Sequence, residues 1–372
     1  MNLVSMRIGI DCRTYGSSHG HIGKYIESFV SYLMENEDGN EYVLFFNDRE
    51  TGEIISESPR FRAIKTSVKM GSISEQLVFP YELFKEKLDM MLFSQSNTPL
   101  FYFGKTIIIL SDLISYFYPE KRMKGIWMRH WQSFILRNSI RKSHVIIAFS
   151  EVLKRDIIEI FDIHEEKIHV IPPMYGELKL GEGNEIQQFL VKEGINEKYI
   201  LSVGDLREYK NIPRLLRAYD LLIKEENITA DLVLVGKEDP GYHEIRSTLI
   251  QLGLQSRVHI YSMLDEEKLG LLYQNASLYV LPSLYEGSEL SILTPFAYNL
   301  PIASSLLPSI TAIFKKDDAV FFRPMSVSEI KEALKKTLSK PSIKQDKRDM
   351  SLYSVDFVSK KILNVFLPPK KI

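Results

Sequence analysis

The chain has 372 residues, of which 45% are hydrophobic and 26% are charged. This length predicts two or three domains, and the composition excludes a long disordered protein. The formal net charge is −1, from 47 basic and 48 acidic residues, which argues against a globally basic nucleic-acid-binding protein. Cys12 is the single cysteine, so the chain can form no internal disulfide and offers no cysteine-based zinc site.

No apolar run approaches the roughly 20 residues that are needed to span a bilayer. The first residues also lack the charged leader and apolar stretch of a signal peptide. We therefore expect a cytoplasmic protein in a reducing compartment.

Short apolar runs alternate with longer helical stretches along the chain. Continuous apolar runs of this length are typical of strands that are buried on both faces of a parallel sheet. The alternation of strands and helices predicts an α/β fold with doubly wound domains. The expected strands are 7–10, 42–46, 90–93, 106–110, 144–149, 169–171, 199–203, 231–235, 258–261, 277–281, 301–303 and 319–322.

Breaks in this pattern give the domain boundaries. Pro172, Pro173 and the aperiodic stretch that follows them interrupt the alternation. The pattern predicts four segments: an N-terminal Rossmann-like domain over 1–173, a linker over 174–197, a second domain over 198–345, and a C-terminal helix over 346–372 that packs back on the first domain.

One helix of the second domain can be placed in detail. Asn211 is positioned to cap it, and Pro213 lies in its first turn. Its apolar residues form one stripe at helical spacing: Ile212, Leu215, Leu216, Tyr219 and Leu222.

A small-residue loop follows the first strand. It contains Gly16, Gly20 and Gly23, and a helix is expected from about Lys24 to Glu35. Glycines between a strand and a helix N-terminus let an anion approach the backbone N–H groups. The spacing is not that of a dinucleotide fingerprint, so this pattern alone favours an ordinary loop.

Two further segments carry charged residues near expected strand ends. Arg207 and Lys210 follow the strand 199–203, where two cations can hold a diphosphate. Taken alone, solvated surface cations are the favoured interpretation. Glu286 and Gly287 precede an expected helix over 289–298. Two interpretations of Glu286 are equally supported: it contacts a sugar or helps to form an anion site, or it only interacts favourably with the helix dipole.

A basic and aromatic segment covers 121–142. Its cations alternate with Trp127, Trp131 and Phe134. This composition fits a helix on an anionic lipid surface. It fits slightly better an amphipathic helix whose apolar face lies in the core, and nucleic-acid binding is disfavoured by the neutral net charge.

Taken together, five segments in order resemble the retaining nucleotide-sugar glycosyltransferases of family four (group 1). They are RIGIDCRT…HIGKY (7–25), IILSDLISYFYPE (108–120), VIIAFSEVLKRDI (145–157), YILSVGDLREYKNIPRLLRAY (199–219) and YVLPSLYEGSELSILTPFAYNLPIASS (279–305). Within the family the pattern is most similar to O-antigen and capsule mannosyltransferases, which commonly use GDP-mannose. The resemblance implies the GT-B architecture, in which two Rossmann-like domains face a cleft.

The resemblance also implies functions for individual residues. Lys210, with Arg207, would hold the donor diphosphate, and Glu286 would contact the donor sugar. The remaining donor-binding positions would be Gly204, Ser288, Glu289, Leu290 and Thr294. The cleft or acceptor side would be lined from the first domain by Gly20, Ile22, Gly23, Lys24, Ser111, Asp112 and Ser150.

The reaction implied needs no metal and no cofactor, because cations and helix N-termini stabilise the leaving diphosphate. Its partners would be a nucleotide-sugar, GDP- or UDP-linked, and a lipid-linked saccharide or oligosaccharide acceptor. The protein would lie at the inner membrane face, with 121–142 as a candidate contact, and would serve bacterial surface polysaccharide synthesis.

Three positions depart from the family pattern. Thr294 replaces the second glutamate of the E-x(7)-E motif, and Ser111 replaces the histidine before Asp112. Glu289 replaces the glycine of the F-G-L-P loop and adds a negative charge. These departures leave open a degenerate GT-B protein that acts as a partner subunit or carbohydrate-binding scaffold. A nucleotide-sugar epimerase is a third and weaker alternative.

Overall fold

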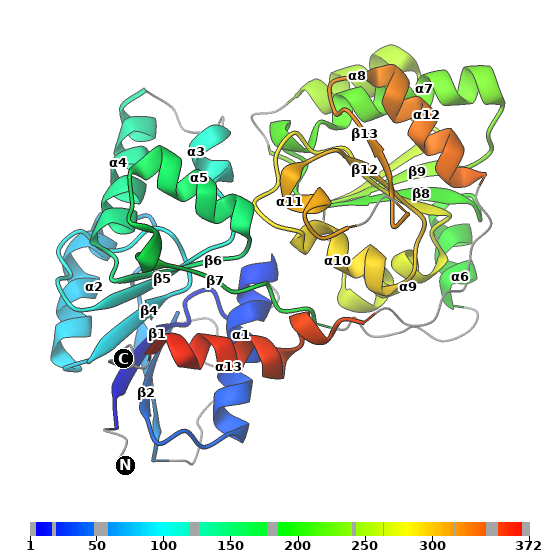
Figure 1. Ribbon diagram of the computed structural model, residues 1–372. Coiled ribbons are helices and arrows are strands. Elements are labelled where there is room, and N and C mark those ends of the chain that lie inside the picture. Colours follow the sequence, from blue (N-terminus) through cyan, green and yellow to red (C-terminus); the bar gives the residue numbers. More distant parts are fainter. Residues whose placement is uncertain are drawn as a thin grey trace. The chain divides into compact units, whose positions relative to one another are not determined.

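The computed structural model describes residues 5–16, 20–47, 59–119, 126–176, 185–239, 243–262, 264–314, 317–339 and 349–366. The chain divides into two compact units. The first comprises Met1–Leu113, Gly125–Gly176 and Ser351–Ile372, and the second comprises Ile114–Lys124 and Glu177–Met350. Figure 1 shows an open sheet with helices on both faces in each unit.

The first unit contains a parallel sheet in the order β3-β2-β1-β4-β5-β6-β7. The strands are β1 (Arg7–Asp11), β2 (Glu41–Asn47), β3 (Phe61–Thr66), β4 (Met90–Phe93), β5 (Thr106–Leu110), β6 (Val145–Ala148) and β7 (Ile168–Val170). The helices of this unit are α1 (Gly20–Glu35), α2 (Ile73–Lys85), α4 (Ile126–Lys142), α5 (Glu151–Phe161) and α13 (Val355–Phe366).

Alternate residues of the strands face opposite layers of helices. Leu44 and Phe46 of β2 belong to the core that contains α1 and α13. Phe45, between them, contacts Phe79 of α2 with ring centroids 5.7 Å apart. This is the alternation expected of a strand that is buried on both faces.

The second unit contains a parallel sheet in the order β10-β9-β8-β11-β12-β13. The strands are β8 (Tyr199–Val203), β9 (Asp231–Val235), β10 (Val258–Tyr261), β11 (Leu278–Leu281), β12 (Ile302–Ser305) and β13 (Val320–Phe322). The helices are α3 (Ile114–Phe117), α6 (Glu185–Glu193), α7 (Ile212–Glu226), α8 (Glu244–Leu252), α9 (Glu266–Asn275), α10 (Leu290–Ala297), α11 (Pro308–Thr311) and α12 (Val327–Leu338).

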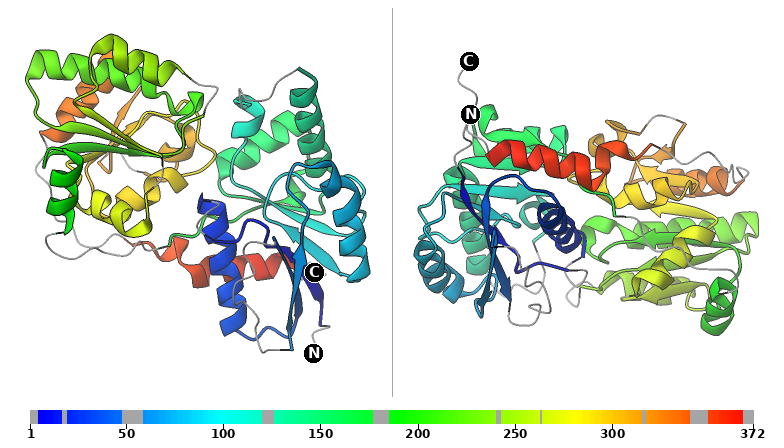
Figure 2. Two further views of the ribbon diagram at one scale, coloured as in Figure 1. Left: turned by 180° about the vertical axis from the view of Figure 1, so that it is seen from behind. Right: turned by 90° about the horizontal axis from the view of Figure 1, so that it is seen from below.

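Two hydrophobic cores cover the two faces of the second sheet. One core contains residues of α7, α8 and α12, and the other contains residues of α6, α9, α10 and α11. The views in Figure 2 show these two layers of helices on either side of the strands. The predicted fold class, α/β with doubly wound Rossmann-like domains, is confirmed.

Three local expectations differ from the structure. The edge strand β3 was not among the expected strands, because its sequence FRAIKT contains two charged residues and only Thr66 is buried. The helix expected from Lys24 begins at Gly20. The side chain of Asn211 does not cap α7: its Nδ2 donates to the carbonyl oxygens of Pro282 (3.0 Å) and Pro324 (2.7 Å) instead.

The predicted linker and the C-terminal segment each contain a helix. The predicted linker 174–197 includes α6, whose Ile186, Phe189 and Leu190 are buried in the second unit. In the C-terminal segment, α13 places Val358 and Ile362 in the core of the first unit.

Candidate functional site

A buried ion pair lies at the carboxyl edge of the second sheet. Lys210 Nζ lies 2.7 Å from Glu286 Oε1, and the two residues are only 5% and 7% exposed. Lys210 ends the short 3-10 turn Glu208–Lys210 after β8, and Glu286 follows β11. β8 and β11 are adjacent strands at the point where the strand order reverses, which is where open α/β sheets bind ligands.

Two serines orient the carboxylate of Glu286. Ser283 Oγ donates to Oε1 over 2.5 Å, and Ser291 Oγ donates to Oε2 over 2.9 Å. Lys210 Nζ also lies 3.3 Å from Ser291 Oγ. Because both carboxylate oxygens have partners, the side chain of Glu286 is held in one orientation.

Tyr279 of β11 connects this group to the neighbouring elements. Its buried hydroxyl donates to the carbonyl oxygens of Ser291 (3.0 Å) and Val203 (3.2 Å). Burial, together with the nearby charge of Glu286, raises the pKa of Tyr279 well above its usual value, so this hydroxyl stays protonated. The start of α10 and the end of β8 are thereby joined beside the ion pair.

Two glycines make room for the side chain of Lys210. Gly204 has φ of +140°, and a Cβ at this position would lie 2.8 Å from Lys210 Cε. A Cβ at Gly236 would lie 1.9 Å from the carbonyl oxygen of Gly204. Only glycine therefore permits the close approach of these loops.

The other predicted donor-binding residues lie around the same edge. Arg207 lies at the start of the 3-10 turn, and its Nε is 3.7 Å from Asp205 Oδ2. Ser288 and Glu289 are buried immediately before α10, and Glu289 occupies its N-cap position. Within α10, Leu290 is the first residue, and Thr294 is half-buried one turn after Ser291.

The residues predicted on the acceptor side belong to the first unit. Gly20, Ile22, Gly23 and Lys24 form the first turns of α1, which follows β1. Ser111 and Asp112 follow β5, with Ser111 Oγ donating to Asp112 Oδ2 over 2.9 Å. Ser150 follows β6 and caps α5, because its Oγ accepts a hydrogen bond of 3.0 Å from the Leu153 N–H.

The predicted basic segment 121–142 falls only partly within the described residues. Residues 121–125, with Lys121, Arg122 and Lys124, lie outside the described residues. The remainder forms α4, in which Ile135, Leu136 and Ile140 are buried. Trp131 and Phe134 are exposed, so this helix contributes to the core and also displays aromatic side chains.

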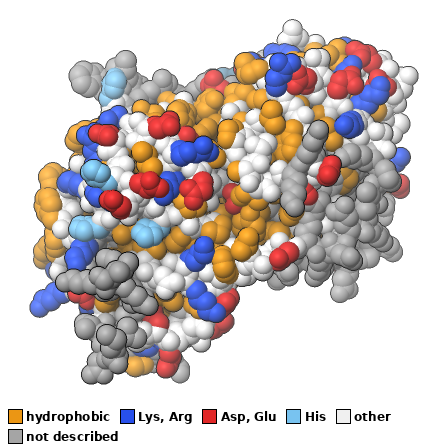
Figure 3. Space-filling view, viewed as in Figure 1, with side chains coloured by type: hydrophobic (Ala, Val, Ile, Leu, Met, Phe, Trp, Pro, Cys, Tyr) orange, Lys and Arg blue, Asp and Glu red, His pale blue; other side chains and the backbone are white. Residues whose placement is uncertain are grey.

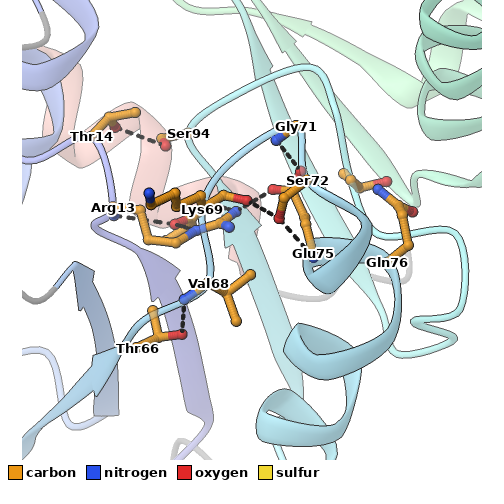
Figure 4. Close-up of polar contacts among 12 residues, drawn as sticks. Arg13, Thr14, Thr66, Val68, Lys69, Gly71, Ser72, Glu75, Gln76 and Ser94 are labelled. Atoms are coloured by element: carbon orange, nitrogen blue, oxygen red, sulfur yellow. Dashed lines mark hydrogen bonds and ion pairs between the residues drawn. The ribbon is translucent and has the colours of Figure 1, made fainter.

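Sequence reasoning missed a buried ionic group at the edge of the first sheet, which Figure 4 shows. Arg13 Nε and Nη2 each lie 2.8 Å from an oxygen of Asp11, and Nη2 lies 2.8 Å from Glu75 Oε1. Glu75 Oε2 accepts a hydrogen bond of 2.6 Å from the Gly71 N–H, and Ser72 caps α2. Burial raises the pKa of Glu75 although Arg13 acts to lower it.

This group ties the end of β1 to the start of α2. Its available signals were the Asp-x-Arg sequence after the first strand and the Ser-x-x-Glu sequence over 72–75. Neither signal reveals that Arg13 and Glu75 meet across 62 positions of the chain. The hydrogen bonds of Ser283 and Ser291 to Glu286 were missed for the same reason, because they form only when the loop between β11 and α10 is folded.

Two kinds of feature are absent from the described ranges. No group of three or more His, Cys, Asp and Glu side chains could hold a metal ion there. No helix among these residues is long and apolar enough to cross a membrane.

Residues 185–353 match the model of the family described as glycosyl transferases group 1. The match includes Lys210, Glu286 and both serines that orient the glutamate. This part of the chain is therefore similar to the group 1 glycosyltransferases.

Several curated proteins are similar to this chain. The serotype-specific mannosyltransferase WbdA of Escherichia coli is 26% identical over 279 residues, which cover 73% of this chain and 34% of that protein. The O-antigen chain mannosyltransferase RfbU of Salmonella typhimurium is 22% identical over 201 residues, which cover 54% of this chain and 52% of that protein. The predicted resemblance to O-antigen mannosyltransferases is confirmed. The chain spans about a third of WbdA and about half of RfbU.

Solved structures of GT-B proteins share the fold. Sucrose-phosphate synthase from Thermosynechococcus elongatus has a TM-score of 0.71 at 15% identity, covering 97% of this chain and 98% of that chain. HepE of Anabaena in complex with UDP and glucose has a TM-score of 0.72 at 11% identity, covering 97% of this chain and 99% of that chain. At these identities the likeness concerns the fold alone, which is the GT-B fold.

Proposed function

We propose that the chain is a retaining hexosyltransferase that moves mannose from GDP-mannose to a lipid-linked or oligosaccharide acceptor. The observation that carries this proposal is the buried pair of Lys210 and Glu286 at the carboxyl edge of a group 1 domain. The names of the relatives, which include O-antigen mannosyltransferases, support the choice of sugar. Bacterial surface polysaccharide synthesis is the corresponding process.

Lys210 is proposed to change partners when the donor binds. Its ammonium group is neutralised by Glu286 in the structure, and a donor diphosphate would offer it a stronger, doubly charged partner. Ser283 and Ser291 would continue to hold Glu286, whose carboxylate would then accept hydrogen bonds from hydroxyls of the sugar. Lys210 and Arg207 would stabilise the charge that develops on the departing diphosphate.

The N-terminal end of α10 would complete the donor site. The backbone N–H groups of Ser288, Glu289 and Leu290 precede or begin this helix, where an anion is stabilised by unpaired donors and the helix dipole. Thr294, half-buried one turn later, would offer one hydrogen bond to the nucleoside. We expect the reaction to need no metal, because these groups supply the positive charge.

The acceptor is proposed to bind at the carboxyl edge of the first sheet. Lys24 lies in the first turns of α1, which follows β1, and Asp112 and Ser150 follow β5 and β6. A lipid-linked acceptor implies a cytoplasmic protein that works at the inner membrane face, and 121–142 is a candidate contact. Neutralising Lys121, Arg122 and Lys124 should weaken binding to anionic vesicles, and unchanged binding would remove this segment from consideration.

Calorimetric titration with GDP, UDP, ADP and CMP, and with their sugar conjugates, tests the donor site. The proposal predicts selective binding of GDP and GDP-mannose that is lost in Lys210→Ala. A ligand at about 100 times its dissociation constant should also stabilise the fold by roughly 2.7 kcal/mol, which a thermal scan detects. Selective binding of another nucleotide would support the proposed donor site but would replace GDP-mannose as the proposed donor.

The second candidate is a catalytically degenerate partner subunit or carbohydrate-binding scaffold. The observation that favours it is Glu289, which is 1% exposed and stands at the helix N-cap where phosphate would lie. Thr294 and Ser111 are further departures from the family pattern. A well-folded protein that binds no nucleotide, but forms a stable complex with another transferase, would replace the enzyme by this candidate.

A further inference from the structure

Helix α2 of the first unit has an unusual distribution of polar and apolar side chains. Its inward face buries Glu75 and Gln76, which bond to Arg13 and to the Leu100 N–H. Its outward face consists of apolar side chains that are 45% to 81% exposed: Ile73, Leu77, Val78, Tyr81 and Phe84. The helix therefore directs apolar residues to solvent, and contiguous exposed patches of this kind mark interaction sites.

The neighbouring loop 98–105 extends this surface. Phe101 and Phe103 are 52% and 73% exposed. The rings of Phe84 on α2 and Tyr102 in the loop lie 5.1 Å apart, and the hydrogen bond between Gln76 and Leu100 measures 2.8 Å. We call the exposed side chains of α2 and of residues 101 and 103 the α2 surface. Figure 3 shows hydrophobic side chains at the margin where α2 lies in Figure 1.

Cations border the α2 surface. Lys85 Nζ lies 4.2 Å from the centre of the Tyr81 ring, and Lys142 Nζ lies 5.1 Å from that of Phe103. Lys105, at the end of the loop, and Arg141, next to Lys142 in α4, are also exposed. Among the described side chains of α2, loop 98–105 and α4, none of the exposed charged groups is acidic, because Glu75 is buried and Glu82 is half-buried.

This combination of charge and apolarity distinguishes the candidate occupants. In a two-fold dimer the surface would meet a copy of itself, and its lysines would face lysines without acidic partners. An anionic bilayer instead offers negative headgroups to the cations and an interfacial layer to the aromatic and aliphatic side chains. Lysines beside aromatic rings also suit the boundary between headgroups and acyl chains, because their apolar stems can lie along the surface while the ammonium groups reach the headgroups.

We infer that the α2 surface binds the headgroup region of an anionic lipid bilayer. The inference is independent of the proposed reaction, because lipid binding can be measured without donor or acceptor. It shares only Arg141 and Lys142 with the candidate contact 121–142 named above, and it does not depend on Lys121, Arg122 or Lys124. Exposed apolar residues of α2 would enter the interface, and Lys85, Lys105, Arg141 and Lys142 would contact headgroups.

Flotation with vesicles tests the inference on the full-length protein. The wild type should float with vesicles of equal parts phosphatidylglycerol and phosphatidylcholine, and not with phosphatidylcholine alone. Leu77→Ser with Tyr81→Ser should weaken binding at least about tenfold. Lys85→Gln with Lys105→Gln should weaken it about fivefold per lysine. The matched controls are Val191→Ser with Ile250→Ser, and Lys192→Gln with Lys198→Gln, at exposed positions of the second unit.

A fluorescence measurement covers the case in which a variant folds poorly. Cys12 is buried, so a polarity-sensitive dye can label Leu77→Cys selectively. Its emission should shift to the blue with anionic vesicles, and a dye on Val191→Cys should not. Unchanged flotation of the α2 variants, or an unshifted dye at position 77, would overturn the inference. If the wild type binds no vesicles but self-associates, and the Leu77 and Tyr81 substitutions abolish this self-association, the occupant of the α2 surface is a second copy of the chain and not a bilayer.

Discussion

The hydroxyl of Ser291 donates a hydrogen bond of 2.9 Å to Glu286 Oε2 and lies 3.3 Å from the ammonium group of Lys210. One side chain of α10 therefore contacts both members of the buried ion pair. The family pattern has proline at this position, so the serine supplies a contact that the proline side chain cannot make. Ser291 is accordingly a positioning residue for Glu286.

Ser291→Ala should reduce kcat/KM for the donor about tenfold, because a hydrogen bond to a charged group is lost. Ser291→Thr, which keeps the hydroxyl, should recover most of this loss. Initial rates at varied donor concentration provide the measurement, with Ser247→Ala on the exposed surface of α8 as the control. Equal rates for wild type and Ser291→Ala would show that Ser283 alone orients the glutamate.

Gly204→Ala should weaken nucleotide binding in addition to lowering the free energy of unfolding. The new Cβ would both strain a backbone with φ of +140° and lie 2.8 Å from Lys210 Cε, displacing the ammonium group. Gly253→Ala is the matched control, since Gly253 has φ of +67° and nothing within 4 Å of the new Cβ. Both variants should lose about 1–3 kcal/mol of unfolding free energy. Calorimetry should detect weaker nucleotide binding only in Gly204→Ala.

The buried ionic group of the first unit makes a prediction about stability. Arg13→Met should lower the free energy of unfolding by about 3–5 kcal/mol, because Asp11 and Glu75 lose their shared cation. The control is Arg246→Met, which removes an exposed pair with Glu238 and should cost less than about 1 kcal/mol. Urea unfolding measures both changes. Similar losses in the two variants would contradict the importance of burial.

Asp231, at the start of β9, makes stability depend on pH. Burial acts to raise the pKa of this carboxyl, but hydrogen bonds from Asn196, Arg257 and His259 outweigh burial and lower it. Because the folded pKa lies below the unfolded value of about 3.9, the stabilisation is complete above that value. It is lost as the pH falls through the folded pKa.

Asp231→Asn should therefore lose about 2 kcal/mol of unfolding free energy at neutral pH, and the deficit should shrink below about pH 4. Urea unfolding of both proteins across the acid range gives the comparison. A deficit of constant size at every pH would mean that packing, and not the charge of Asp231, stabilises this corner of the sheet.

The strands were predictable where the sequence is continuously apolar. Runs such as 107–110 and 232–235 are buried on both faces, so their hydrophobicity directly reports their position. β3 could not be found in this way, because an edge strand exposes charged residues. Asn211 has the residue type of a helix cap, yet carbonyl groups 71 and 113 positions away accept its amide hydrogens.

The candidate site was predictable only as a set of motifs. Lys210 and Glu286 were identified, but their ion pair depends on a contact across 76 positions. The contacts of Ser291 with both members likewise exist only in the folded domain. The apolar outward face of α2 was hidden for a related reason: helical spacing shows that apolar residues share a face, but not that Glu75 is held inside by Arg13.

The most direct test of the account measures GDP release from GDP-mannose in the presence of a lipid-linked saccharide acceptor. The wild type is compared with Lys210→Ala, with Glu286→Ala, and with Lys224→Ala, which removes an exposed lysine of α7 that lies 2.8 Å from Asp220. The account predicts turnover by the wild type and Lys224→Ala, and none by the folded Lys210 and Glu286 variants. Full activity in those two variants would contradict the proposed roles of both residues.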